Sequence, residues 1–241
     1  MPMENAISIT TSRDAQLEAA SLLSKTLTDL GCAHAYIGGF AWALLGSRRL
    51  TEDIDVLIEI ENFEGQSILK IRQQLSTLNQ QFAEAGLKFY FVKELSGSLT
   101  GEQLVRANKG NVMIETLQAG QLGLPKTAGP IYELRVESGP VFNLLHPGVL
   151  ILTKMNRWSV NRESTRPKTI RKQRSDTNDL RWLVIWLAAE QFTIDFDNYK
   201  GKTREQLLGL VSVYRETMCA EDKELMEALK KAMKPADWIL L

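Results

Sequence analysis

The stretch of sequence that decides the fold is YIGGFAWALLGSRRLTEDIDVLI, residues 36–58. An apolar run over 33–37 ends at Gly38 and Gly39, and apolar residues fill positions 40–45 directly after them. A short apolar run that stops at glycine and continues as a longer apolar segment predicts a strand, a tight turn and a helix.

Two acidic residues lie on the next predicted strand. From position 53 onward the residues alternate, so that Ile54 and Val56 share one face and Asp53 and Asp55 share the other. Because successive side chains of a strand point to opposite faces, the two carboxylates project side by side.

Outward from this centre, the first part of the chain mixes helices with strands. The pattern predicts helices over 12–31 and about 66–85, strands over 87–92 and 111–117, and a hairpin of 131–136 and 141–145 around Ser138, Gly139 and Pro140. After Pro147 only helices are predicted, over 149–160, 176–190, 203–218 and 222–233. We therefore expect an α/β (α+β) fold, with a mixed-sheet domain over residues 1–146 and a helical domain over 147–241.

Composition restricts the classes of function. The 29 basic and 29 acidic residues give a formal net charge of zero, which argues against general attraction to nucleic acid or membrane and still permits a basic patch. Cys32 and Cys219 lie far apart in apolar sequence, which favours free thiols in a reducing, cytoplasmic compartment. The sequence has no apolar run of the roughly 18 residues that a membrane span needs, and residues 1–11 do not look like a signal peptide, so we expect an unexported protein without a membrane partner.

The paired glycines form a candidate phosphate site. Glycines between a strand and a helix let backbone N–H groups approach a phosphate closely, and the positive end of the helix adds to the attraction. We therefore expect Gly38 and Gly39 to seat a triphosphate.

The acidic residues form a candidate metal site. Carboxylates as close as those of Asp53 and Asp55 repel each other, whereas Mg²⁺ takes carboxylate and phosphate oxygens as ligands and removes the repulsion. Glu115 interrupts an apolar run over 112–117, where a carboxylate is costly unless it is paired or binds metal. If this strand lies beside that of Asp53, three carboxylates converge on a site for two ions, which suits in-line phosphoryl transfer.

The order of glycines, basic and hydroxyl residues and acids resembles the nucleotidyltransferase superfamily typified by DNA polymerase β. Within it, the stretch is most similar to the minimal and abortive-infection-toxin (AbiEii-type) nucleotidyltransferases, in which an Arg and a Thr precede the aspartate pair. The residues that carry the resemblance are Ile37, Gly38, Gly39, Arg49, Thr51, Asp53, Ile54 and Asp55.

The resemblance implies roles for these positions. Asp53 and Asp55 bind two Mg²⁺ ions, Glu115 is the third acid and helps to activate the acceptor hydroxyl, and the glycine turn holds ATP or another nucleoside triphosphate. Arg49 and Thr51 are expected to order the turn into the acidic strand and to belong to the nucleotide site. The alternative, in which these residues bind neither metal nor nucleotide, is a tight turn followed by a surface strand that carries acids.

A second informative segment is basic. Eight Lys or Arg residues lie between Lys154 and Arg174, against the single acid Glu163. Lys154 and Arg157 share a helix face, so both are candidates to offset the charge of the triphosphate, and the resemblance also implies a lysine from this helix near the phosphates. We expect residues 161–173 to form a loop, which either binds the acceptor or is simply solvated.

Two further features of the helical part allow two interpretations each. Asp176 and Asp179 resemble an acidic helix start of the abortive-infection type, but helix capping by Ser175 and Asp176 is the favoured account. Trp182 and Trp186 lie four residues apart beside apolar neighbours, a spacing that favours core packing over base stacking.

The sequence thus predicts an enzyme, a magnesium-dependent nucleotidyltransferase that moves a nucleoside monophosphate from a nucleoside triphosphate to a hydroxyl acceptor. An RNA end, a protein side chain and a small molecule are all open as acceptors. The alternative is a non-catalytic nucleotide-binding module or one partner of a toxin–antitoxin pair. The oligomeric state is left open.

Overall fold

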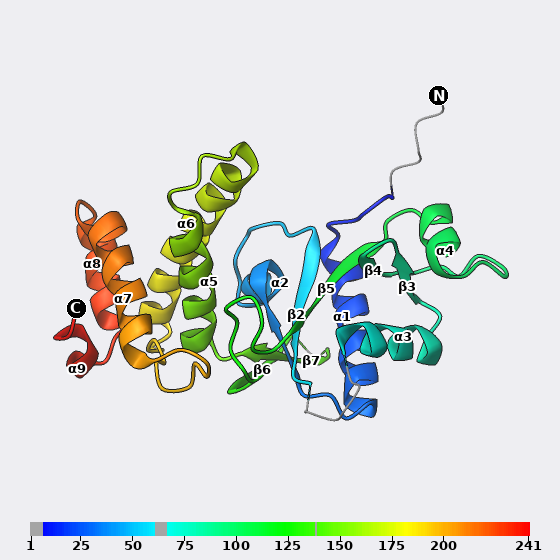
Figure 1. Ribbon diagram of the computed structural model, residues 1–241, viewed down its shortest axis with the longest axis horizontal. Helices are drawn as coiled ribbons and strands as arrows, with labels where there is room; N and C mark the ends of the chain where they lie inside the picture. The colour runs from blue at the N-terminus through cyan, green and yellow to red at the C-terminus, as the bar shows by residue number, and fades with distance from the viewer. Residues whose placement is uncertain (1–6, 61–66, 138) are drawn as a thin grey trace. The chain divides into compact units, whose positions relative to one another are not determined.

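The computed structural model describes residues 7–60, 67–137 and 139–241. The chain divides into two compact units, the first of Met1–Ala119 and Glu133–Leu144 and the second of Gly120–Tyr132 and Leu145–Leu241 (Figure 1). The sheet belongs to the first unit, apart from Ile131, Tyr132 and Leu145 at its edge, and the longest helix, Pro167–Ala189, belongs to the second. Each unit is described by itself.

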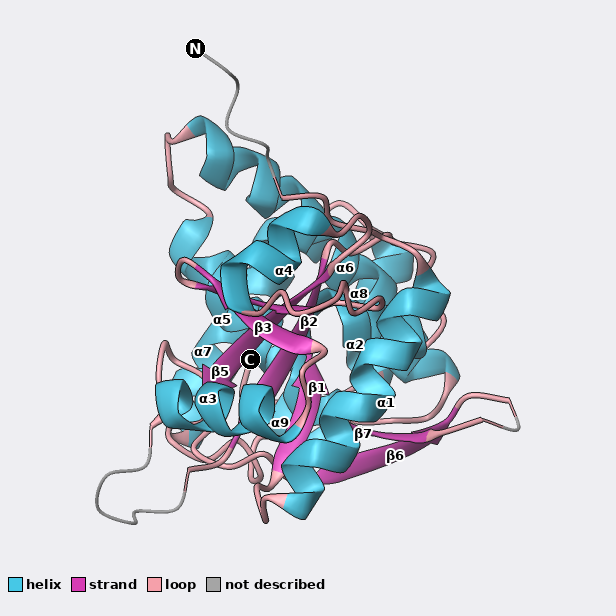
Figure 2. Ribbon diagram, turned by 90° about the vertical axis from the view of Figure 1, so that its right-hand side faces the viewer, coloured by secondary structure: helices cyan, strands magenta, loops and turns pink. Residues whose placement is uncertain are grey.

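The first unit is built on a seven-stranded mixed sheet. Its elements are α1 (Arg13–Asp29), β1 (His34–Ile37), α2 (Gly38–Leu44), β2 (Asp53–Ile58), α3 (Ile68–Leu78), β3 (Phe82–Ala85), β4 (Lys88–Phe91), α4 (Gly101–Ala107), β5 (Val112–Gln118), β6 (Ile131–Arg135) and β7 (Val141–Leu145). The strand order is β3-β4-β5-β2-β1-β7-β6, with β6 and β7 at one edge (Figure 2). Because β2 pairs antiparallel with β1 and parallel with β5, the predicted mixed-sheet α/β fold is confirmed.

Helices α1 and α3 cover one face of this sheet. The hydroxyl of Tyr36 on β1 donates a hydrogen bond to the carbonyl of Ala20 on α1, and Arg72 on α3 donates to the hydroxyl of Thr116 on β5. Tyr36 and Thr116 both pair with Val56, so they mark the same face. The side chains of β2 that alternate with Val56 therefore point to the opposite face.

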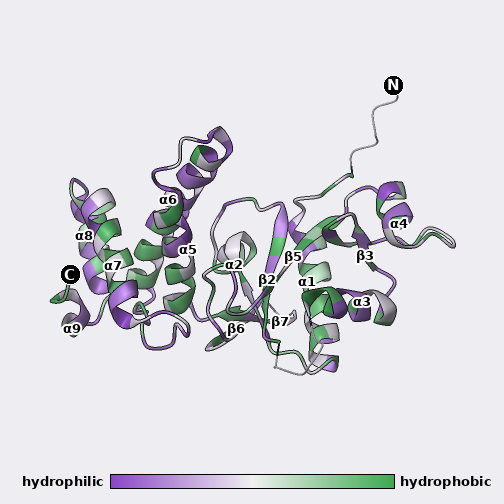
Figure 3. Cartoon of the chain, viewed as in Figure 1, coloured by the Kyte–Doolittle hydropathy of each residue, from purple (hydrophilic) through white to green (hydrophobic). Residues whose placement is uncertain are grey.

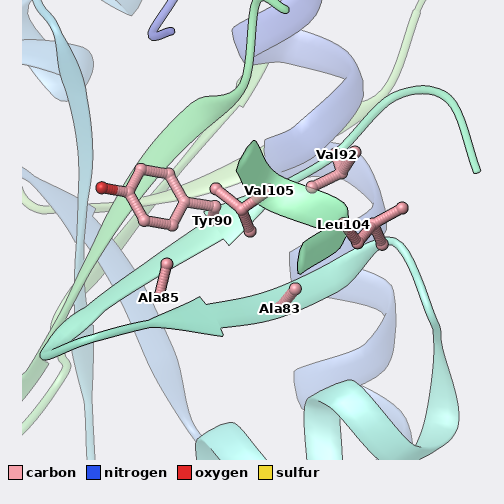
Figure 4. Close-up of a cluster of buried hydrophobic side chains, with 6 residues drawn as sticks. All are labelled: Ala83, Ala85, Tyr90, Val92, Leu104 and Val105. Carbon is pink, nitrogen blue, oxygen red and sulfur yellow. The ribbon is translucent and has the colours of Figure 1, made fainter. Parts of the chain in front are cut away.

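Helix α4 covers part of that opposite face, at the β3–β4 edge. A buried apolar cluster there consists of Ala83, Ala85, Tyr90, Val92, Leu104 and Val105 (Figure 4). Met113 of β5 packs against it. Met113 is the register partner of Asp53. The acidic face of β2 is thus continuous with a packed apolar layer on one side.

The second unit is helical. Its elements are α5 (Pro147–Asn161), α6 (Pro167–Ala189), α7 (Arg204–Tyr214), the π-helix η1 (Arg215–Cys219), α8 (Lys223–Lys231) and α9 (Pro235–Trp238). Helix α5 packs against α6 and α7, and α6 packs against α8. His146 caps α5 by accepting a hydrogen bond from the amide of Gly148, as expected for a residue at a helix start.

Two predicted elements differ from the structure. The helix expected over about 66–85 ends at Leu78, and Phe82–Ala85 is strand β3, because pairing with β4 overrides the helix propensity of the alanines there. Gln66 and Ser138, which were assigned to that helix and to the hairpin turn, lie outside the described residues. The loop expected over 161–173 is wrong from Pro167 onward, since Pro167 occupies the first turn of α6, a position that proline favours.

The assignment of Trp182 and Trp186 to the core is also wrong. Both rings are partly exposed, whereas Leu183 and Leu187 of the same helix are fully buried. The spacing of four residues predicted a common face correctly and did not reveal which face the rings share. In the part of the chain that the structure describes, no helix has both the length and the apolarity to cross a bilayer.

Candidate functional site

Three acidic side chains meet on the face of the sheet opposite α1 and α3. Asp53 and Asp55 come from β2, and Glu115 comes from the parallel neighbour β5. One carboxylate oxygen of each lies within 4.8 Å of the others. This spacing suits oxygen ligands that share one or two hard cations.

The strand register produces this convergence. Asp55 is paired with Glu115 across the parallel ladder, and Asp53 lies two residues away on the same face. On the other side of β2, Ile37 at the end of β1 is paired with Asp55. A shift of one residue in either pairing would send the acids to the helix-covered face, so the buried face fixes the site.

The exposure of the acids corrects one argument made from the sequence. Glu115 is exposed and the two aspartates are half-buried, so Glu115 does not lie in the apolar surroundings that its sequence neighbours suggested. The apolar neighbours alternate between the faces of β5, and a hollow of 250 Å³ borders Glu115. Its position beside Asp55, and not the cost of burying it, identifies it as a member of the site.

Gly38 lies directly against the acids. Its φ is +63°, and a Cβ atom built there would lie 1.7 Å from Oδ2 of Asp55. Any other residue would collide with the carboxylate in addition to adopting a strained backbone. The missing side chain therefore brings the backbone of the β1–α2 junction into contact with the acidic strand.

Gly39 makes a second close approach. A Cβ atom there would lie 2.6 Å from Oγ1 of Thr51 and 3.5 Å from Nη1 of Arg49. The sequence had suggested a separate turn before the helix, but both glycines lie in the first turn of α2. Amides in the first turn of a helix have no partner within that helix, so they are donors for an external acceptor.

Thr51 connects the acidic strand to α1. The buried hydroxyl of Thr51 lies 3.0 Å from Oδ1 of Asp53 and 3.1 Å from the carbonyl oxygen of Asp53. Nε2 of Gln16 on α1 donates a hydrogen bond to the carbonyl oxygen of Thr51 at 2.8 Å. A hydroxyl has one proton, so it donates to one of these acceptors at a time. Sequence reasoning missed Gln16, because a polar residue on an amphipathic helix gives no signal of a contact 35 positions away.

A second acidic cluster lies within the helical unit. Nζ of Lys154 on α5 is 2.9 Å from Oδ1 of Asp176 and 2.9 Å from Oδ2 of Asp179, both on α6, and all three side chains are buried. Nε of Arg157 donates to Oδ2 of Asp176 at 3.0 Å, and its Nη2 donates to Oδ1. Burial would raise the pKa of Asp176, but the hydrogen bonds and charges of Arg157 and Lys154 outweigh it and hold that pKa below its ordinary value.

This cluster corrects the favoured account of Asp176. Ser175 and Asp176 do not cap a helix, because α6 starts at Pro167 and runs without a break through both. The sequence could not reveal that Asp176 pairs with Lys154, because no local pattern connects it to a lysine 22 positions earlier. Within its own unit Lys154 is therefore a partner of carboxylates, and its predicted role toward a triphosphate stays a prediction, as does that of Arg157.

The comparisons with known proteins bear on the fold. No protein-family model matches the chain, and no curated protein matches it in sequence. Among solved structures, the chain is similar to an antigenic nucleotidyltransferase-like protein from Paracoccidioides brasiliensis, with a TM-score of 0.65 and 18% sequence identity over 93% of this chain and 96% of that one. At this identity the likeness shows a nucleotidyltransferase-like fold, and the narrower abortive-infection type stays a prediction.

Proposed function

We propose that the chain is a divalent-metal-dependent nucleotidyltransferase that moves a nucleoside monophosphate from a nucleoside triphosphate to a hydroxyl acceptor. One observation carries the proposal: Asp53, Asp55 and Glu115 bring ligand oxygens within 4.8 Å of one another on neighbouring parallel strands. The nucleotidyltransferase-like fold, matched over 93% of the chain, supports it.

The residues present fit a magnesium site. All three donors are carboxylates, the ligand type that Mg²⁺ prefers, and the half-exposed position leaves room for water and phosphate oxygens. The backbone of Gly38 comes so near Asp55 that a phosphate held by the first-turn amides of α2 would lie beside the same carboxylates. When bound, the metal neutralises phosphate charge and polarises the reacting oxygens.

The proposed reaction is an in-line substitution at the α-phosphorus. An oxygen of the acceptor hydroxyl forms a bond to this phosphorus, the bond from the phosphorus to the bridging oxygen breaks, and pyrophosphate leaves. Glu115, the most exposed of the three acids, accepts the hydroxyl proton, and Thr51 holds the Asp53 carboxylate in place through its hydroxyl.

The remaining assignments belong to the proposal as well. Gly38 and Gly39 seat the triphosphate, Arg49 beside Gly39 contributes to the nucleotide site, and Lys154 and Arg157 offset the charge of the nucleotide. The identity and number of the ions, a preference for ATP and a cytoplasmic location are likewise proposed. Cys32 and Cys219 are both free thiols, which is compatible with a reducing compartment.

The direct test is label transfer from α-phosphate-labelled ATP, CTP, GTP and UTP. The protein is incubated with each nucleotide, MgCl₂ and either total RNA or a protein lysate, and the fraction that retains label is identified. We expect transfer with Mg²⁺, none with EDTA, and a loss of at least about 1,000-fold in the Asp53→Asn/Asp55→Asn variant, because the charge stabilisation that the metal supplies is lost.

Glu52→Gln is the matched control. Glu52 is an exposed acid directly before Asp53 and is not a member of the acidic triad, so its loss removes a negative charge beside the site and should leave transfer intact. If the protein binds a nucleoside triphosphate with Mg²⁺ and labels no acceptor, including itself, the non-catalytic nucleotide-binding module replaces the transferase. If it binds none of the four nucleotides, both interpretations are wrong.

A further inference from the structure

One face of α6 carries a row of basic side chains followed by a row of aromatic ones. The exposed or partly exposed residues recur at steps of three or four positions, which places them on one side of the helix: Lys168, Arg171, Arg174, Asn178, Trp182 and Trp186. The opposite side carries Asp176, Leu180, Leu183 and Leu187, and all four are fully buried. The first side is therefore the outer face of α6 within its unit.

The basic end of this face is strongly charged. Arg166, Lys168, Arg171, Lys172 and Arg174 are all exposed, and the structure gives none of them an ion pair with a described residue. The first turns of α6 and the end of α5 extend beyond the other helices of their unit and are mostly hydrophilic (Figures 1 and 3). In a chain whose net charge is zero, this concentration of positive charge creates a local surface for phosphates.

The aromatic end provides flat rings beside the basic end. The rings of Trp182 and Trp186 are nearly parallel, with centroids 6.3 Å apart and an interplanar angle of 27°. Phe192 continues the row: its ring centroid lies 5.5 Å from that of Trp186, with an interplanar angle of 12°. The rings of Tyr132 and His146 pack edge-on against Phe192. None of these five side chains is fully buried, although large aromatic rings normally contribute most by burial.

We infer that this face of α6 binds single-stranded nucleic acid, with phosphates on the basic turns and one or more unstacked bases on the Trp182 end of the aromatic row. Charge complementarity selects a polyanion, and flat, partly exposed rings in line with the charges select one whose bases are free to stack. A duplex would use the basic turns alone. Lys168 and Trp186 lie 18 residues apart on one helix, about 27 Å at 1.5 Å per residue, which is enough for several nucleotides.

The inference deepens the proposed function, on which it rests for the role of the bound strand as an acceptor. If the transferase proposal holds, an RNA with a single-stranded end becomes the favoured acceptor class. Binding itself requires neither a nucleoside triphosphate nor Mg²⁺, so it is measured without both and repeated with the Asp53→Asn/Asp55→Asn chain. Equal binding by both chains separates this surface from the acidic site.

The test measures binding by fluorescence anisotropy with three labelled probes: a 12-nucleotide single-stranded RNA, single-stranded DNA of the same sequence, and the RNA in a duplex. Trp182→Ala/Trp186→Ala should weaken binding of the single strand by about tenfold or more and leave its salt dependence unchanged, because stacking releases no counterions. Lys168→Gln/Arg171→Gln/Arg174→Gln should weaken binding and also reduce the slope of log affinity against log salt by about 2, at roughly 0.7 per lost phosphate contact.

Matched controls come from the same unit. Lys223→Gln/Lys230→Gln/Lys231→Gln removes equal charge from exposed positions of α8, and Trp238→Ala removes a partly exposed ring outside the row. Both should leave binding within about twofold of wild type. Equal losses in the α6 and α8 charge variants, tighter binding of the duplex, or no effect of the tryptophan pair would overturn the inference. Binding that persists while label transfer fails would leave it intact and reject the transferase proposal.

Discussion

The two units hold acidic clusters of opposite design. In the first unit Asp53, Asp55 and Glu115 converge on one another at the open face of a sheet. In the second unit Asp176 and Asp179 converge on the ammonium of Lys154 inside a helix pair. Acid meets acid in one cluster, and acid meets base in the other.

The two clusters differ in their effect on the stability of the fold. Buried carboxylates that meet a buried cation stabilise the packing of α5 against α6, and removing one partner leaves an uncompensated charge. Carboxylates that face one another repel and cost stability, which a fold tolerates where a ligand is to be bound. Changes in the first cluster should therefore act mainly on metal binding and activity, and changes in the second should act first on the free energy of unfolding.

The largest expected effect on stability is at Lys154. Lys154→Met leaves Asp176 and Asp179 buried beside an apolar side chain and should lower the free energy of unfolding by about 3–5 kcal/mol. Urea unfolding followed by circular dichroism measures the change. Lys230→Met, at an exposed position on α8, is the control and should stay within about 0.5 kcal/mol of wild type. A loss under about 1 kcal/mol at Lys154 would remove the contrast between the clusters.

The next effect is at Gly38. Gly38→Ala must move the Asp55 carboxylate, because the new Cβ would lie 1.7 Å from its oxygen, and we expect transferase activity to fall by about 100-fold or more. Gly31→Ala is a close control, since Gly31 has a φ of +70° and open space around its Cβ position. Both variants bear the backbone strain of about 1–2 kcal/mol, so equal activity in the two would refute a special role for Gly38.

A smaller effect is expected from magnesium itself. If Mg²⁺ binds with a Kd of about 1 mM, Mg²⁺ at about 10 mM should stabilise the wild-type protein by about 1.4 kcal/mol. Glu115→Gln should gain clearly less, and without divalent ions it should be at least as stable as wild type, because one of three repelling charges is gone. Thermal unfolding with and without MgCl₂ measures both, with Glu52→Gln as the control. An equal magnesium-dependent gain in Glu115→Gln would exclude Glu115 from the metal site.

The smallest expected effect is a difference in pH dependence. The pKa of Asp176 is lowered in the folded state, so its ionised form stabilises the fold above the unfolded-state pKa of about 3.8, and this contribution is lost as pH falls through the lower folded-state pKa. Between about pH 5 and about pH 3 the free energy of unfolding of Asp176→Asn should therefore fall less steeply than that of wild type. Parallel slopes in urea unfolding across this range would show that Asp176 contributes nothing to acid sensitivity.

Local patterns were sufficient for the glycines and the two aspartates of the acidic site. The alternation around Asp53 and Asp55 depends on the geometry of one strand, and the glycine pair depends on the junction of a strand with a helix; the structure has both. The convergence of three carboxylates was predicted on the condition that the strand of Glu115 lies beside the strand of Asp53. The pairing of Asp55 with Glu115 in the ladder of β2 and β5 meets this condition. The burial of Glu115 was predicted wrongly, because apolar neighbours in sequence alternate between two faces and do not surround a side chain.

The helical unit was harder to predict for a physical reason. The partnership of Lys154 with Asp176 is set by the packing of α5 on α6, which no spacing in the sequence reports. The first turns of α6 lack apolar periodicity, although Pro167 at its first position was a start signal that could have been used. Trp182 and Trp186 share a face by spacing alone, and only the buried leucines on the other side show that this face is the outer one.

The parallel pairing of β2 with β5 has a consequence for synthesis of the protein. Asp55 and its register partner Glu115 are 60 positions apart, and a parallel pair can form only after the whole crossover between its strands exists. A chain that has left the ribosome only as far as residue 107 therefore has Asp53 and Asp55 but lacks Glu115, the third acid of the cluster. Because strand pairing at this separation requires slow closure of a long loop, the acidic cluster of a newly made molecule stays incomplete until β2 and β5 have paired.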